Sequence, residues 1–151
     1  MGLFGSKEKP EDIKYNAMSM MGKNQPKAAV SLFNKVLKQN PSDIEALFNK
    51  GLALNQIKKY SDAVTCFDKV LEINPKDAQA LNNKGIAMAE NGDIQSASEC
   101  YDAAIVVDPK YAPSFFNKGV LLDKLEEREL ALTVLEKAIS IDPRKPNAMV
   151  Y

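Results

Sequence analysis

The sequence repeats every 34 residues, and this period restricts the fold more than any other feature of the chain. Several residue types recur at this step without insertion or deletion. A fixed period of about 20–50 residues is the signature of an array of stacked supersecondary units. We therefore expect four copies of one unit. The recurring positions are Pro41, Pro75, Pro109 and Pro143; Ala29, Ala63, Ala97 and Ala131; and Gly51, Gly85 and Gly119.

Each repeat reads as a pair of amphipathic helices. In the second repeat, Leu47 and Gly51 lie on one helix face, four residues apart. Ser61 or Asp62 suits the start of the next helix, and Pro75 ends it, because proline has no N–H to donate. The same scheme in every repeat predicts an all-α chain of about eight helices, at residues 10–23, 26–39, 44–57, 60–73, 78–91, 94–107, 112–125 and 128–141.

Small residues recur where the two helices of a pair would cross. We expect Gly51 to face Ala63, because a larger side chain there would push the two backbones apart. Glycine inside a helix costs about 1 kcal/mol relative to alanine, so a close approach is the expected compensation. The same pairing is expected for Gly85 with Ala97 and for Gly119 with Ala131.

The repeats resemble the tetratricopeptide repeat, a 34-residue unit with the pattern W-x-x-L-G-x-x-Y, then A-x-x-x-F, then P. The second repeat matches it at Leu47, Lys50, Gly51, Leu54, Ala63, Phe67 and Pro75. Smaller apolar residues replace the Trp, Leu or Met replaces the Tyr, and the Leu before Gly becomes Lys50, Lys84 or Lys118. These lysines are expected to mark a solvated edge, because a lysine stem can lie on a surface with its ammonium in water.

The resemblance covers residues 10–145 and implies a right-handed α-solenoid of four antiparallel helix pairs. We divide the chain into a lead (1–9), four repeats (10–43, 44–77, 78–111 and 112–145) and a segment, 146–151, that begins a fifth repeat. The first helix of each pair is expected to line a concave groove. In this family such grooves bind a peptide or helical segment of a partner protein.

The family's register also indicates which residues face the groove. They combine apolar side chains with amides and few charges, which suits a neutral or mildly apolar peptide. These expected groove residues are Lys14, Tyr15, Met18, Phe48, Asn49, Leu52, Asn82, Asn83, Ile86, Phe116, Asn117 and Val120.

Two features of this lining have alternative interpretations. Asn49, Asn83 and Asn117 form a ladder whose amides could pair with the backbone of an extended peptide, but asparagine is common at this position throughout the family. Phe48 and Phe116 could anchor a ligand, or they could pack against neighbouring helices. Both alternatives stay open at this point.

A carboxylate clamp, known from chaperone co-factors of the family, is not expected. Such a clamp needs several cationic donors for the ligand's C-terminal carboxylate. Lys14 and Asn49 match its pattern, whereas Met18, Gln79 and Asn83 occupy the other three places. Only one cation remains.

Composition excludes other functions. The chain has no histidine, and no nucleophile–base motif or glycine-rich phosphate loop is present, so we expect no enzyme activity, no cofactor and no metal site. Twenty basic residues balance twenty acidic ones, which disfavours nucleic acid. No apolar run reaches the roughly 20 residues of a transmembrane helix. Cys66 and Cys100 lie 34 residues apart on successive helix pairs, too far for a disulfide, so reduced thiols and a cytoplasmic location are expected.

The two ends of the chain lead to two further hypotheses. At the C-terminal end no polar cap is visible. Either the sequence is part of a longer repeat array, or Leu132, Leu135 and Ile139 form a face for self-association into a homo-oligomeric scaffold. At the other end, Gly2 and Ser6 fit an N-myristoylation pattern, although a short lead rich in Gly and Lys is the preferred interpretation.

Overall fold

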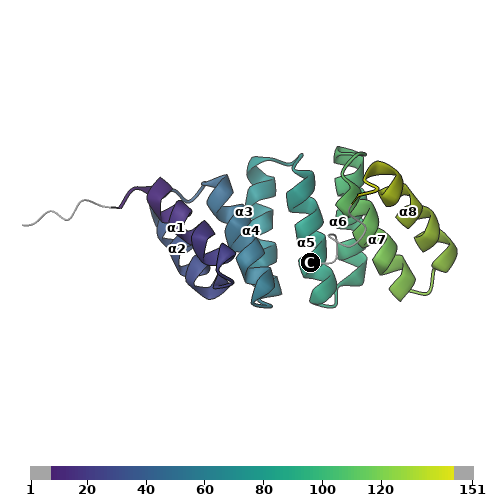
Figure 1. The fold of residues 1–151 in the computed structure, drawn as a ribbon, viewed down its shortest axis with the longest axis horizontal. Helices are drawn as coiled ribbons and strands as arrows, with labels where there is room; N and C mark the ends of the chain where they lie inside the picture. Colours follow the sequence, from purple (N-terminus) through teal and green to yellow (C-terminus); the bar gives the residue numbers. More distant parts are fainter. Residues whose placement is uncertain (1–7, 145–151) are drawn as a thin grey trace, which may run out of the picture. The chain divides into compact units, whose positions relative to one another are not determined.

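The computed structural model describes residues 8–144, and in this part of the chain the ordered elements are α-helices (Figure 1). The chain divides into two compact units, an N-terminal half (Met1–Lys69) and a C-terminal half (Val70–Tyr151). The expectation of an all-α chain of helix pairs is confirmed. The helices are α1 (Pro10–Gly22), α2 (Pro26–Gln39), α3 (Ile44–Gln56), α4 (Tyr60–Ile73), α5 (Ala78–Glu90), α6 (Ile94–Val107), α7 (Ala112–Lys124) and α8 (Arg128–Ile141).

In the N-terminal half, α1 packs on α2 and α2 on α3, and α1 also contacts α3. The core is built from small and medium-sized side chains with one large ring at its centre. This composition lets the helix backbones approach closely while still filling the space between them. The buried cluster consists of Ile13, Ala17, Ala29, Phe33, Val36, Ala46 and Ala53.

The C-terminal half repeats this arrangement. Here α5 packs on α6, α6 on α7 and α7 on α8, and α5 also contacts α7. Ala97, Tyr101 and Leu121 form its buried cluster, with Ile86 and Met88 packed against it. The first helices of successive repeats therefore lie next to each other in each half, α1 beside α3 and α5 beside α7. This arrangement places their side chains on one shared face.

The turns between repeats explain why proline keeps the 34-residue period. The residue before each of the four recurring prolines accepts a hydrogen bond through Oδ1 from the backbone N–H two residues later, which is an Asx-type turn. Asn40 and Asn74 do so at 3.2 and 3.3 Å, and Asp108 and Asp142 at 3.0 and 3.1 Å. The first three of these turns lead into a new first helix. Asp43 and Asp77 cap two of these helices by accepting from N–H groups at 2.9 Å.

Glycine at the recurring position lies closest to a large side chain of the second helix, and in two repeats also close to the expected alanine. A Cβ at Gly51 would lie 2.7 Å from Cζ of Phe67, rather than meeting Ala63 first. At Gly85 and Gly119 the nearest atoms likewise belong to Tyr101 and Leu135, with the carbonyl oxygens of Ala97 and Ala131 farther away. Glycine therefore makes room for the large residue four positions after the alanine.

The first helices end one residue earlier than expected. Two residues beyond the end of each, the backbone takes a positive φ, at Asn24 (56°), Lys58 (61°), Gly92 (91°) and Glu126 (63°). This left-handed residue reverses the chain direction into the second helix, a common way to end a helix. The second helices end where the prolines predict.

Candidate functional site

The candidate site is the face formed by the first helices of each half. In the N-terminal half, α1 and α3 are joined across this face by a hydrogen bond from Lys14 Nζ to Glu45 Oε2, 2.8 Å long. Tyr15 is 77% exposed, and Met18 is exposed as well. Leu52 on α3 is half-buried. Two large side chains on α1 are therefore available to a ligand.

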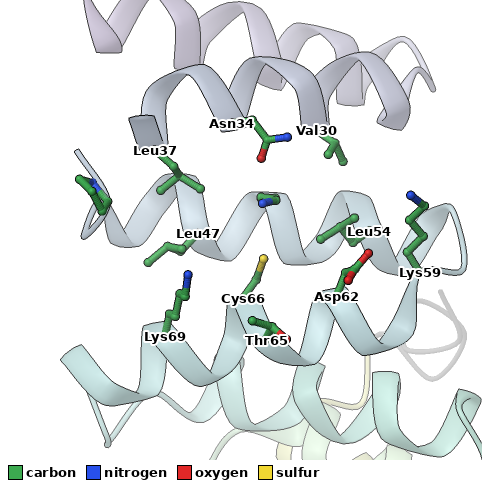
Figure 2. A pocket seen from close by; sticks show the side chains of 12 residues that line it. Val30, Asn34, Leu37, Leu47, Leu54, Lys59, Asp62, Thr65, Cys66 and Lys69 are labelled. Carbon is green, nitrogen blue, oxygen red and sulfur yellow. The ribbon is translucent and has the colours of Figure 1, made fainter. Parts of the chain in front are cut away.

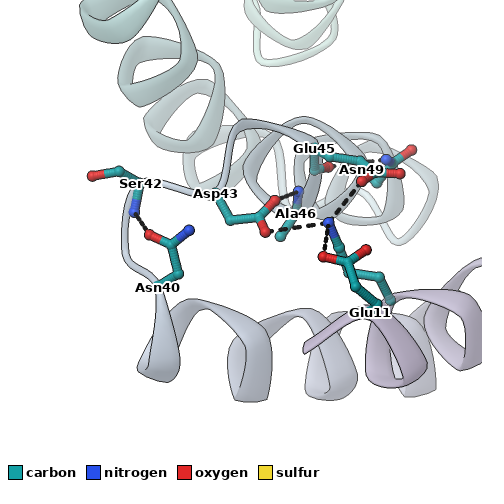
Figure 3. Close-up of polar contacts among 8 residues, drawn as sticks. Glu11, Asn40, Ser42, Asp43, Glu45, Ala46 and Asn49 are labelled. Carbon is teal, nitrogen blue, oxygen red and sulfur yellow. Dashed lines mark hydrogen bonds and ion pairs between the residues drawn. The ribbon is translucent and has the colours of Figure 1, made fainter. Parts of the chain in front are cut away.

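Lys14, one of the expected groove residues, is engaged in ion pairs within the fold. Its ammonium also lies 3.1 Å from Glu11 Oε1 and 3.3 Å from Asp43 Oδ2, so three carboxylates surround it (Figure 3). The hydrogen bond to Glu45 raises the pKa of Lys14 above its ordinary value; Glu11 and Asp43 add to this, and burial opposes it. Lys14 is therefore buried and ion-paired to residues of the fold itself. The i,i+3 spacing of Glu11 and Lys14 was the signal in the sequence that could have indicated this role.

Phe48 packs within the fold. Its ring makes an edge contact with Phe67, with centroids 5.8 Å apart and planes at 69°. Because Phe67 also fills the space over Gly51, these residues form one packed layer between α3 and α4. Phe48 therefore packs against a neighbouring helix, as one of the two interpretations held. The half-exposed part of its ring is the part that a ligand can contact.

The asparagines differ in their hydrogen bonding. Asn49 Nδ2 donates to the carbonyl oxygen of Glu45, and Asn83 Nδ2 donates to that of Gln79, both at 2.9 Å. Asn117 instead donates to Asn82 Oδ1, also at 2.9 Å. Two asparagines thus make the same local hydrogen bond, each to its own helix, and the third is engaged across α5 and α7.

Asn82 does not lie where the register suggested. Its side chain is only 3% exposed, because the bond from Asn117 holds it between α5 and α7. Ile86 packs against the cluster of Ala97, Tyr101 and Leu121, while Phe116 and Val120 are half-buried. The surface that α5 and α7 offer is therefore more closed than that of α1 and α3.

Lys118 also departs from expectation. The sequence predicts a solvated edge for it, but its side chain is largely covered and its Nζ forms an ion pair with Asp102 on α6. The pair lies between the first helix of one repeat and the second helix of the repeat before it. Its role is to join consecutive repeats.

On α8, the expected self-association face is partly exposed. Leu132 is 60% and Ile139 is 51% exposed, and they lie seven residues apart on one side of the helix. Leu135 is half-buried because it packs over Gly119. Gly2 and the segment 146–151 lie outside the described residues.

Residues 8–144 contain no group of three or more His, Cys, Asp or Glu side chains placed to hold a metal ion. Cys66 and Cys100 are both buried, and neither forms a disulfide. Within the same range, no helix has the length and apolarity needed to cross a membrane.

Comparisons with known proteins agree with this architecture. A family model described as the N-terminal TPR repeats region of Psidin matches residues 15–118, and the tetratricopeptide repeat model matches residues 112–145. No curated protein sequence matches the chain.

Solved structures share the fold over most of their length. MamA (residues 41 to the end) from Desulfovibrio magneticus RS-1 is 24% identical, with a TM-score of 0.84 over 92% of this chain and 78% of that one. Another MamA crystal structure is 27% identical, with a TM-score of 0.76 over 84% and 74%. A thermophilic TPR protein from Thermus thermophilus is 20% identical, with a TM-score of 0.80 over 89% and 75%.

Proposed function

The chain belongs to the tetratricopeptide repeat family, and from this we propose that it is a non-catalytic interaction module which binds a segment of a partner protein. Each half offers one first-helix face to such a segment, α1 with α3 in the N-terminal half and α5 with α7 in the C-terminal half. The family's fold supports the general role of a protein-interaction scaffold, since stacked repeats present extended surfaces for binding.

The observation that carries the proposal is the exposure of Tyr15 on α1. Exposed aromatic side chains are enriched where proteins bind partners, because a rigid ring buries a large area at little entropic cost. Tyr15 is 77% exposed, with exposed Met18 one turn further along the same helix. Methionine adapts its shape to a bound side chain. Together they offer an apolar contact that the fold itself does not use.

The polar part of the surface suits peptide backbone. Asn49 and Asn83 each donate a hydrogen bond to the carbonyl oxygen four residues earlier on their own helix. Each bond uses one amide N–H and leaves the remaining N–H and the Oδ1 directed to other partners. A peptide in extended conformation presents C=O groups that can accept from the remaining amide N–H, and N–H groups that can donate to the Oδ1.

The charge at this surface selects against acidic ligands. Lys14 is bound by Glu11, Asp43 and Glu45, so one positive charge meets three negative charges there. Glu11 and Glu45 remain exposed at the rim. The ligand is therefore a neutral or basic segment with an apolar side chain. Buried cysteines that form no disulfide fit a cytoplasmic location.

Affinity capture from a lysate of the source organism, followed by mass spectrometry, tests this function. The test variant carries Tyr15→Ala, Asn49→Ala and Asn83→Ala. The matched control carries Ser31→Ala, Lys35→Ala and Lys38→Ala, three exposed residues on α2. The control should recover the same partner as the wild type and the test variant should lose it. Equal recovery by all three proteins would rule out the first-helix faces as the binding surface.

The exposed side of α8 favours a second function, a self-associating scaffold. Leu132 and Ile139 are both more than half exposed on one side of that helix. Exposed apolar clusters are frequent at association sites. Light scattering of Leu132→Lys, Ile139→Lys against the wild type tests it: a wild type that stays monomeric at high micromolar concentration would exclude this function.

A further inference from the structure

A cleft of about 430 Å³ opens in the N-terminal half, between α2 and α4 and above α3 (Figure 2). Its floor is apolar and buried, formed by Leu47 and Leu54 from α3 and by Cys66 from α4. Val30 and Leu37 contribute its α2 wall. The first-helix face described above uses none of these residues.

The rim of the cleft is basic. Lys50, Lys59 and Lys69 surround it with a single carboxylate, that of Asp62. Lys50 and Lys69 also influence Cys66 on the floor of the cleft. Burial raises the pKa of the Cys66 thiol, and the positive charges of these two lysines partly oppose the rise. A ligand that fits must therefore bring an apolar side chain for the floor and carboxylates for the rim.

The balanced net charge of the chain conceals a strong asymmetry. Residues 1–69 contain eleven lysines and seven acidic residues, whereas residues 70–151 contain thirteen acidic residues, seven lysines and two arginines. The N-terminal half thus carries a net charge of +4 and the C-terminal half −4. Opposite charges of this size steer two copies toward a head-to-tail encounter, basic half to acidic half.

One segment of the C-terminal half has the chemistry that the cleft requires. The turn between α7 and α8 carries Glu126, Glu127 and Glu129 around a shallow hollow with Leu130, and only Arg128 opposes their charge. Leu125 and Leu130 at its ends are exposed.

The same turn is held in a fixed shape. The N–H groups of Glu126 and Glu127 donate to the carbonyl oxygens of Asp123 and Leu122, both at 3.0 Å. At the equivalent positions of the second repeat stand Lys58 and Lys59, and Lys59 lies on the cleft rim. The acidic turn and the basic rim are therefore counterparts in the repeat register.

We propose that the acidic α7–α8 turn of one copy docks in the basic α2–α4 cleft of a second copy, with a leucine of the turn against the Leu47–Leu54 floor. The two surfaces differ, so the contact is heterologous and leads to open or ring-shaped head-to-tail assemblies. The proposal does not depend on peptide binding by the first helices, and it uses a different surface from Leu132 and Ile139.

A charge exchange tests the contact. One full-length variant carries Lys59→Glu and Lys69→Glu, and the other carries Glu126→Lys and Glu127→Lys. Lysine tolerates the positive φ at residue 126, since Lys58 adopts 61° at the equivalent place. Matched controls of equal charge change carry Lys27→Glu with Lys35→Glu, or Glu72→Lys with Glu90→Lys, all at exposed positions that line neither the cleft nor the hollow at the turn. Circular dichroism confirms that each variant is folded.

Light scattering and sedimentation give the outcome. The wild type and both controls should associate as concentration rises, and association should weaken from about 0.1 M to about 1 M NaCl. Each charge reversal alone should raise the dissociation constant at least about tenfold. An equimolar mixture of the two reversals should associate again, because each cleft then meets a turn of opposite charge.

Three results would overturn the proposal. The first is a wild type that remains monomeric at every concentration. The second is a mixture of the two reversals that associates no better than either reversal alone. The third is association that survives both reversals but is lost on Leu132→Lys with Ile139→Lys, which would assign the contact to the exposed side of α8.

Discussion

The ring of Phe67 lies where the side chain of any residue other than glycine at position 51 would have to be: a Cβ there would be 2.7 Å from Cζ and 2.8 Å from Cε1 of Phe67. Phe67 is fully buried and its ring also meets Phe48, so it has no free space to move into. The glycine thus serves close packing of the helix pair rather than an unusual backbone angle.

Gly51→Ala should therefore destabilise the protein, although alanine is the better helix former. The overpacking cost of about 1–3 kcal/mol exceeds the helix-propensity gain of about 1 kcal/mol. Urea unfolding should show a net loss of about 1 kcal/mol, and at most about 2 kcal/mol, in the free energy of unfolding. Gly22→Ala is the control, since a Cβ at Gly22 has no atom within 4 Å, and it should leave stability unchanged or higher. Equal effects of the two substitutions would refute the packing explanation.

Ser114→Ala should stabilise the protein. The Ser114 hydroxyl is fully buried and has no hydrogen-bond partner within the described part of the chain, a state that costs about 1–3 kcal/mol. Ala46 and Ala80, at the same position of earlier repeats, are also fully buried. We expect a gain of about 1 kcal/mol in the free energy of unfolding. Ser31→Ala, at an exposed site, should change it by less than about 0.5 kcal/mol. A loss of stability in Ser114→Ala would show that the hydroxyl has a partner.

Lys14→Met should destabilise the protein at neutral pH by about 1–2 kcal/mol, because three carboxylates lose their shared cation. The pKa of Lys14 in the folded state is raised above its ordinary value. The stability that Lys14 contributes is therefore fully present below the pKa of a lysine in the unfolded chain, and it is lost as pH rises through the pKa of Lys14 in the folded state. The difference in the free energy of unfolding between wild type and variant should be the same at about pH 7 and about pH 9, and smaller at about pH 11. Lys35→Met serves as the exposed control. A difference that grew with alkaline pH would contradict this role.

Cys66 should react slowly with iodoacetamide in the folded protein. Burial raises the pKa of its thiol, which lowers the thiolate fraction, and its sulfur is covered. At about pH 8 we expect labelling at least about tenfold slower than in urea, measured by peptide mass spectrometry. Thr65→Cys with Cys66→Ala and Cys100→Ala places an exposed thiol next to the same site as a control. Equally fast labelling of both thiols would show that the reagent reaches the Cys66 sulfur from the α2–α4 cleft.

The helix bounds could be predicted from the sequence because the signals are local and repeat four times. Proline and the Asx turn before it mark the end of each second helix, as at Asn74 and Pro75. The end of each first helix differs by one residue from the prediction, because a positive φ at a residue such as Lys58 or Glu126 leaves little trace in the amino-acid type. Gly92 is the strongest signal among these positions and Asn24 a weaker one, because both residue types favour a positive φ.

The side-chain roles were harder to predict, because register indicates a face but not what covers it. Lys14 and Asn82 hold groove positions by register, yet Glu45 on the neighbouring helix binds the first and Asn117 covers the second. Both partners lie more than 30 residues away in sequence. The basic cleft has the same origin, since Lys50, Lys59 and Lys69 come together only when α3 and α4 pack.

The most direct test of the central claim is a nuclear magnetic resonance titration of the isotope-labelled protein with the segment bound by its captured partner. We predict amide shift changes concentrated on the first helices, at Tyr15, Met18, Asn49 and Asn83, with small changes on α2, α4, α6 and α8. Changes concentrated on the second helices, with Tyr15 and Asn83 unaffected, would contradict binding at the first-helix faces.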